Sequence, residues 1–85
     1  PQQMRPARLL MLAQIARQQG DLEVAETALE TAHAVAPDDA LICQEYSKLM
    51  CDKEQTAQAV DFAAMALSLA PENPRIQAHH ATLAS

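Results

Sequence analysis

The chain has 85 residues, enough for one small domain, and a domain of this size buries only about 60 to 65% of the surface of its unfolded chain. With 49% hydrophobic residues, almost no aromatic residues and one glycine, it favours closely packed helices and excludes a glycine-rich phosphate-binding loop. Its net charge of −5, without a basic face carrying interleaved aromatic residues, argues against nucleic acid as a partner.

Apolar residues that recur every three or four positions predict five helices along the chain. They are expected over residues 7–19, 22–36, 40–52, 56–70 and 75–84. Gly20 ends the first helix, and Pro37 and Pro71 end the second and fourth, because a proline inside a helix removes a hydrogen bond. The sequence therefore predicts an all-α domain with turns near residues 20, 38, 54 and 73.

Short polar side chains stand just before three of these helices. Asp21, the pair Asp38-Asp39 and Thr56 are each expected to accept hydrogen bonds from the first amide groups of the helix that follows.

Each predicted helix carries one apolar stripe that can pack against its neighbours. The stripes consist of Leu9, Leu12, Ala13 and Ala16, then Ala25, Leu29, Ala32 and Val35, then Ile42, Cys43, Tyr46 and Met50, then Ala59, Phe62, Ala63 and Ala66, and last Ile76, Ala81 and Ala84. We expect the alanines at 25, 32, 59 and 66 to be buried at close helix contacts.

The sequence also repeats itself. Pro37 and Pro71 lie 71 − 37 = 34 positions apart, and the same offset aligns three pairs of alanines. These pairs are Ala25 with Ala59, Ala32 with Ala66 and Ala36 with Ala70. A fixed period of this length is typical of helical repeat proteins.

With these residues in view, the chain resembles the tetratricopeptide repeat family, whose 34-residue unit is a helix-turn-helix with the pattern W-x2-L-G-x2-Y, then A-x3-F, then P. The pattern falls on Leu9, Leu12, Ala13, Ala16, Gly20, Ala25, Leu29, Ala32 and Pro37 in the first unit, and on Cys43, Tyr46, Ser47, Met50, Ala59, Ala63, Ala66 and Pro71 in the second. The chain departs from it by lacking tryptophan and by placing Glu54 where the turn glycine usually sits.

This resemblance implies helix-turn-helix repeats in a short right-handed α-solenoid. The first unit is expected over residues 6–39, the second over 40–73, and a capping helix or truncated repeat over 74–85. Residues 1–85 are then a single domain, and we expect it to be a fragment of a longer protein because it begins Pro-Gln-Gln without a methionine.

Residues that could carry chemistry are few. His79 and His80 are adjacent, so they point about 100° apart on a helix and make poor metal ligands. Cys43 and Cys51 are about 12 Å apart along one predicted helix, too far for a disulfide. Two unpaired thiols favour a reducing cytoplasm. No enzymatic activity, cofactor or metal is therefore expected.

The resemblance implies that the first helices of successive units line a concave groove that binds a peptide. The positions expected to face it are Leu10, Gln14, Arg17, Leu41, Gln44, Lys48, Cys51, Arg75, Ala78 and Thr82. None is acidic, so this surface predicts an acidic partner or one that ends in a free carboxylate. Chaperone tails are not expected, because only Arg75 keeps the charge of the family's carboxylate clamp and Glu45 would repel the ligand.

A second function class remains open. Leu10 and Met11 lie off the main stripe of the first helix, which favours a self-assembly element that forms homo-oligomers within a larger multidomain protein. A membrane is not expected as a partner, because no apolar run reaches the roughly 20 residues that span a bilayer and no signal peptide opens the chain.

Overall fold

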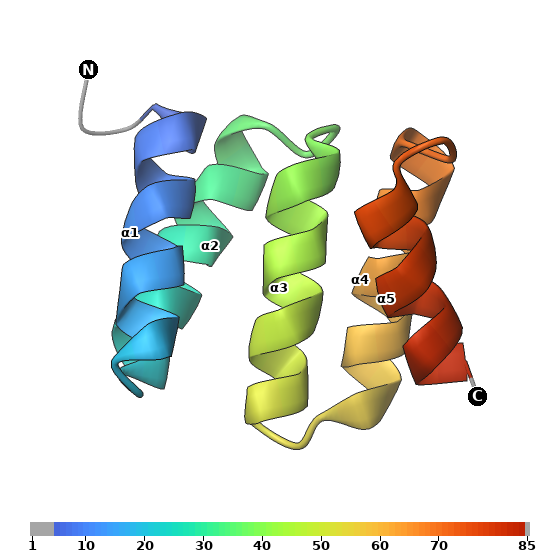
Figure 1. The fold of residues 1–85 in the computed structure, drawn as a ribbon. Helices are drawn as coiled ribbons and strands as arrows, with labels where there is room; N and C mark the ends of the chain where they lie inside the picture. The colour runs from blue at the N-terminus through green and yellow to red at the C-terminus, as the bar shows by residue number, and fades with distance from the viewer. Residues whose placement is uncertain (1–4, 85) are drawn as a thin grey trace.

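The computed structural model describes residues 5–84, and every regular element in this range is an α-helix (Figure 1). The helices are α1 (Pro6–Gln18), α2 (Leu22–Val35), α3 (Ala40–Asp52), α4 (Thr56–Leu69) and α5 (Pro74–Ala84). The five predicted helices are thus confirmed, with ends that differ by at most one residue from those expected.

Aspartate and asparagine side chains cap three of the helices. Asp21 Oδ1 accepts a hydrogen bond from the Val24 amide at 3.3 Å, and Asp39 Oδ1 accepts from the amides of residues 41 and 42. Asn73 does the same for the start of α5. Thr56 is the first helical residue of α4 and not its cap, so that prediction was wrong; Gln55 holds the cap position without a side-chain hydrogen bond. Of the two aspartates before α3, only Asp39 is the cap.

The turns inside the two units have the same backbone geometry. Gly20 has φ +81° and Glu54, 34 positions later, has φ +61°, so both lie in the left-handed region. The amide of each donates to the carbonyl three residues back, and the next amide donates to the carbonyl five residues back, at 2.8 to 3.0 Å. This is the Schellman arrangement, which satisfies the last carbonyl groups of α1 and α3.

Pro37 and Pro71 follow the last residues of α2 and α4. Ala36 and Ala70 close these helices with a hydrogen bond to the carbonyl four residues back. The prolines therefore stand where no further helical hydrogen bond is made, and they interrupt no helix.

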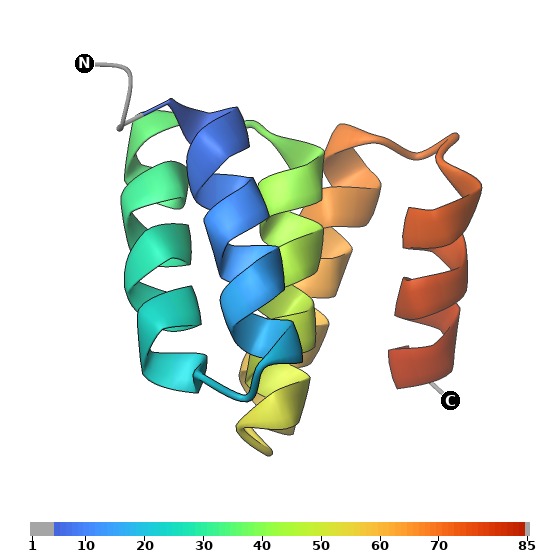
Figure 2. The same cartoon turned by 60° about the vertical axis from the view of Figure 1, so that its left-hand side comes forward.

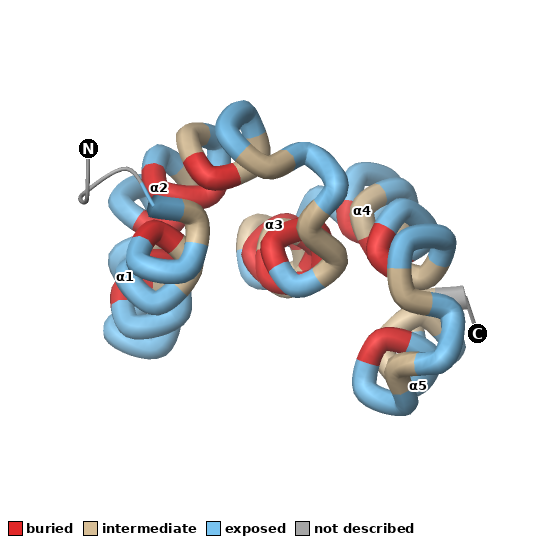
Figure 3. The backbone as a smooth tube through the Cα atoms, turned by 90° about the horizontal axis from the view of Figure 1, so that it is seen from above, coloured by how far each residue is buried: buried red, intermediate tan, exposed pale blue. Residues whose placement is uncertain are grey.

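The helices form a curved row in which α1, α3 and α5 lie on the inner side and α2 and α4 on the outer side (Figure 3). Contacts join each helix to the next along the chain and also join α1 to α3. The last helix, α5, stands at one end of the row (Figure 2). This arrangement is that of about two helix-turn-helix units followed by a capping helix.

The four alanines predicted to lie at helix contacts are buried, as expected. Ala25, Ala32, Ala59 and Ala66 are all fully buried. Leu12 and Val35, predicted on the packing stripes, are instead about half exposed.

Candidate functional site

A small polar slot opens between the inner helices. It has a volume of about 190 Å³ and is lined by Gln14 of α1, by Leu41, Gln44, Glu45 and Lys48 of α3, by Asn73 and by Arg75 of α5. The start of α5 lies near the N-terminal half of α3 at this point, because the proline-containing turns place the starts of both helices at the top of the molecule as seen in Figure 1.

Five of the ten positions expected from the sequence to face the groove line this slot: Gln14, Leu41, Gln44, Lys48 and Arg75. The other five, Leu10, Arg17, Cys51, Ala78 and Thr82, do not line it. Leu10 packs against the hydrophobic core, and Arg17 lies lower on α1 in ion pairs with α3. The sequence reasoning missed Asn73, a turn residue whose carboxamide caps α5, because it considered only helix positions.

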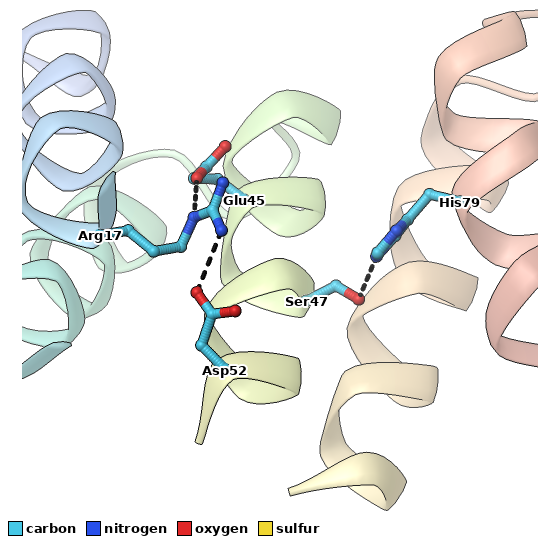
Figure 4. Close-up of polar contacts among 5 residues, drawn as sticks. All are labelled: Arg17, Glu45, Ser47, Asp52 and His79. Atoms are coloured by element: carbon cyan, nitrogen blue, oxygen red, sulfur yellow. Dashed lines mark hydrogen bonds and ion pairs between the residues drawn. The ribbon is translucent and has the colours of Figure 1, made fainter. Parts of the chain in front are cut away.

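Arg17 joins α1 to α3 through two carboxylates (Figure 4). Its Nε donates to Glu45 Oε2 at 2.7 Å and its Nη1 to Asp52 Oδ2 at 3.0 Å. Burial lowers the Arg17 pKa, but the hydrogen bonds to Glu45 and Asp52 outweigh it and raise the pKa above its ordinary value. Arg17 was expected to offer its charge to a ligand, and in the structure two carboxylates within the fold already balance that charge.

Glu45 brings a carboxylate to the wall of a slot that was expected to contain none. The residue is only 3% exposed, and its ion pair with Arg17 compensates its charge. Because the charge is compensated, Glu45 repels an incoming anion much less than an unpaired carboxylate would.

The two cations of the slot remain unpaired. Neither Lys48 nor Arg75 makes an ion pair or a side-chain hydrogen bond with any residue that the structure describes. Gln44 is almost fully buried, and its Oε1 has no hydrogen-bond partner among these residues. The slot therefore combines two available positive charges with a buried amide whose hydrogen-bonding capacity is unused.

Ser47 and His79 tie α5 to α3 (Figure 4). The Ser47 hydroxyl donates to the Ala59 carbonyl at 2.7 Å, so the 2.9 Å contact with His79 is a hydrogen bond from Nε2–H to Oγ. Burial, followed by the charge of Lys48, lowers the pKa of His79. Since Ser47 is fully buried, the pair is a structural tether and not a nucleophile with its base.

Other reactive groups are dispersed over the fold. Among the residues that the structure describes, no three His, Cys, Asp or Glu side chains are grouped as a metal site would require. Cys43 and Cys51 are both free thiols, and burial raises the pKa of each, which keeps them protonated at neutral pH. None of the described helices is long and apolar enough to cross a membrane.

The two residues predicted for self-association differ in their surroundings. Met11 is exposed, whereas Leu10 is half-buried against the core. The large apolar side chains that accompany Met11 on the surface of α1 are instead Leu12 and Ile15.

Comparison with known proteins agrees with the repeat geometry. A tetratricopeptide repeat family model matches residues 16–83, which cover most of the two units and nearly all of α5. No curated protein and no solved structure matches the chain. The family match spans well over half of the 85 residues and includes α2 to α4, both Schellman turns and both closing prolines. The chain belongs to the tetratricopeptide repeat family.

Proposed function

We propose that this domain is a non-catalytic protein-interaction module that holds an anionic group of a partner peptide between Lys48 and Arg75. The observation that carries the proposal is the pair of unpaired cations in one small slot on the concave side of the row. Two such charges suit a carboxylate, either that of an Asp or Glu side chain or that of the peptide's C-terminus.

The amides around these cations suit a peptide backbone. Gln14 is exposed at the α1 side of the slot, and the almost fully buried Gln44 also lines it. Carboxamides both donate and accept hydrogen bonds, so they pair with the N–H and C=O groups of an extended chain. Leu41, which is half exposed, offers an apolar contact next to them. The two free thiols favour a cytoplasmic location for this interaction.

The test uses two synthetic peptides of the same acidic sequence, one ending in a free carboxylate and the other in an amide, with binding followed by fluorescence anisotropy. Lys48→Gln with Arg75→Gln is expected to weaken binding of the free-acid peptide several-fold. The matched control, Arg5→Gln with Arg8→Gln, removes the same charge from exposed positions outside the slot and is expected to leave binding within twofold.

The comparison of the two peptides identifies the anionic group. Loss of affinity on amidation assigns the slot to a C-terminal carboxylate, and equal affinity assigns it to acidic side chains. An equal effect of the slot variant and its control would overturn the proposal, because the attraction would then be a property of net charge alone.

A further inference from the structure

The side of the first unit that faces away from the second unit is unusually apolar. Met11, Leu12 and Ile15 of α1 are 61, 46 and 47% exposed, and Val24 of α2 lies beside them. We call these four residues the outer face. A groove of about 470 Å³ runs between α1 and α2 on this side and is lined by Leu9, Leu12, Glu23, Val24, Thr27, Ala28 and Thr31. Isolated exposed leucines are common, but a continuous patch beside a groove marks an interaction surface.

The second unit shows what covers three of these four positions, whereas Gln58, the counterpart of Val24, is exposed there. Thirty-four positions on, the counterparts of Met11, Leu12 and Ile15 are Glu45, Tyr46 and Leu49. Glu45 and Leu49 are 3% and 0% exposed, and Tyr46 is half-buried. The same three places are thus exposed in the first unit and covered in the second.

The covering elements in the second unit are α1 and α2. Arg17 of α1 pairs with Glu45, and His33 of α2 packs edge-on against Tyr46 with ring centroids 6.2 Å apart. His33 also meets Phe62, whose ring stacks on that of Tyr46 at 4.2 Å. In the second unit, the preceding helical hairpin therefore covers the counterparts of Met11 and Leu12.

The opposite end of the row has a different surface. On α5, Ile76 is buried and Leu83 half-buried against the preceding helices. Among the α5 residues whose burial the structure describes, the exposed ones are Pro74, Arg75, Gln77, Ala78, Ala81 and Thr82, and none is a large apolar residue. α5 thus closes its end of the row with a surface suited to water, and the outer face does not.

We propose that the outer face is a docking surface for a further helix-turn-helix unit of the same polypeptide, ahead of α1, which packs on α1 and α2 as these pack on α3. In the docking unit, the residue equivalent to Arg17 is apolar, because it contacts Met11, whereas Arg17 contacts Glu45. It carries an acid opposite Arg8, which is exposed and makes no ion pair with any described residue.

The test adds such a unit to the chain. A copy of residues 6–39, with Arg17→Leu in the copy, is fused directly before Pro6, which reproduces the spacing between α2 and α3. Circular dichroism is expected to show helix content rising in proportion to length. We expect one cooperative thermal transition with a midpoint about 5 °C or more above that of the 85-residue chain.

A substitution on the outer face then separates docking from local effects. Ile15→Glu in the original unit is expected to lower the midpoint of the extended chain by several degrees and to leave the 85-residue chain nearly unchanged, because Ile15 is exposed there. Gln58→Glu, at an exposed position of α4, serves as the control and is expected to affect both chains equally little.

Three results of the fusion experiment would overturn the proposal. The added unit could stay non-helical, it could unfold in a separate transition, or Ile15→Glu could destabilise both chains alike. Sedimentation of the 85-residue chain tests whether a second copy of the chain covers the outer face instead. If this chain is a dimer that Ile15→Glu converts to a monomer, a second copy covers the face and the proposed unit does not.

Discussion

At the scale of single residues, the two Schellman turns are a natural comparison, because Gly20 and Glu54 adopt nearly the same backbone conformation with different side chains. The left-handed conformation destabilises a residue that has a Cβ by about 1 to 2 kcal/mol, whereas it destabilises glycine very little. Glu54→Gly is therefore expected to raise the free energy of unfolding by about 0.5 to 1 kcal/mol, since part of the gain is lost to the more flexible unfolded chain. Urea unfolding measures the change.

The reverse substitution provides the control for this turn. Gly20→Ala is expected to destabilise by about 1 kcal/mol through the backbone alone, because an added Cβ meets no atom within 4 Å. If Glu54→Gly lowered stability instead, the Glu54 side chain would have to make a favourable contribution that exceeds its backbone strain.

The alanines predicted at the helix contacts leave no room for a larger side chain, because they are fully buried. Ala32 is fully buried, so Ala32→Leu is expected to overpack the contact and to destabilise by about 1 to 3 kcal/mol. Ala34→Leu places the same side chain on the exposed side of the same helix and is expected to change stability by no more than about 0.5 kcal/mol. Equal effects of the two variants on the thermal midpoint would contradict the close contact at residue 32.

At the scale of whole helices, Arg17 is the polar link between α1 and α3. Arg17→Gln leaves the buried Glu45 carboxylate without its partner, and we expect it to cost about 1 to 3 kcal/mol. Adding Glu45→Gln is expected to recover part of that loss, because the unpaired charge is removed. A double-mutant cycle from urea unfolding measures the coupling, and strictly additive effects would contradict it.

His79, at the contact between α3 and α5, favours its neutral form in the folded state because it is partly buried. Burial and Lys48 lower its pKa in the folded state, and Glu45 opposes them. The unfolded chain therefore binds the proton more readily, so this contribution to stability is complete above the ordinary histidine pKa of about 6.5 and decreases as the pH falls below it. We expect the urea concentration at the unfolding midpoint to decrease as the pH is lowered from about 6.5 to 5.5. His79→Gln is expected to reduce this dependence of the midpoint on pH.

His80→Gln is the control for this pH dependence, because it removes the adjacent histidine and leaves the hydrogen bond between Ser47 and His79 in place. An unchanged slope in His79→Gln, or an equal reduction in both variants, would show that other groups cause the pH dependence.

Sequence reasoning predicted the helices well because their signals are local: apolar periodicity, capping aspartates and prolines all act within a few residues. It failed where a partner is distant in the chain. Arg17 was assigned to the ligand because Glu45 and Asp52 lie 28 and 35 residues away. Leu12 was placed in the core because periodicity identifies an apolar face without identifying what covers it.

At the scale of the whole molecule, the slot is a local positive site in a domain of net charge −5. The Debye length is about 8 Å at physiological ionic strength, so most of the distant acids are screened and a ligand responds mainly to Lys48 and Arg75. The curvature of the row makes this possible, because it brings the start of α5 toward α3 on the concave side (Figure 3).

Salt should therefore weaken binding of an acidic peptide through these two contacts. Exposed charge contacts contribute about 0.2 to 1 kcal/mol each, so removing both corresponds to an about 2- to 30-fold loss of affinity. We expect a loss in this range between 0.15 and 1 M sodium chloride, where the Debye length shortens to about 3 Å. In the variant with Lys48→Gln and Arg75→Gln, affinity should already be low at 0.15 M and should change little with salt. If affinity were independent of salt in the unmodified chain, or equally dependent on it in the variant, the two cations would not be the contacts that hold the peptide.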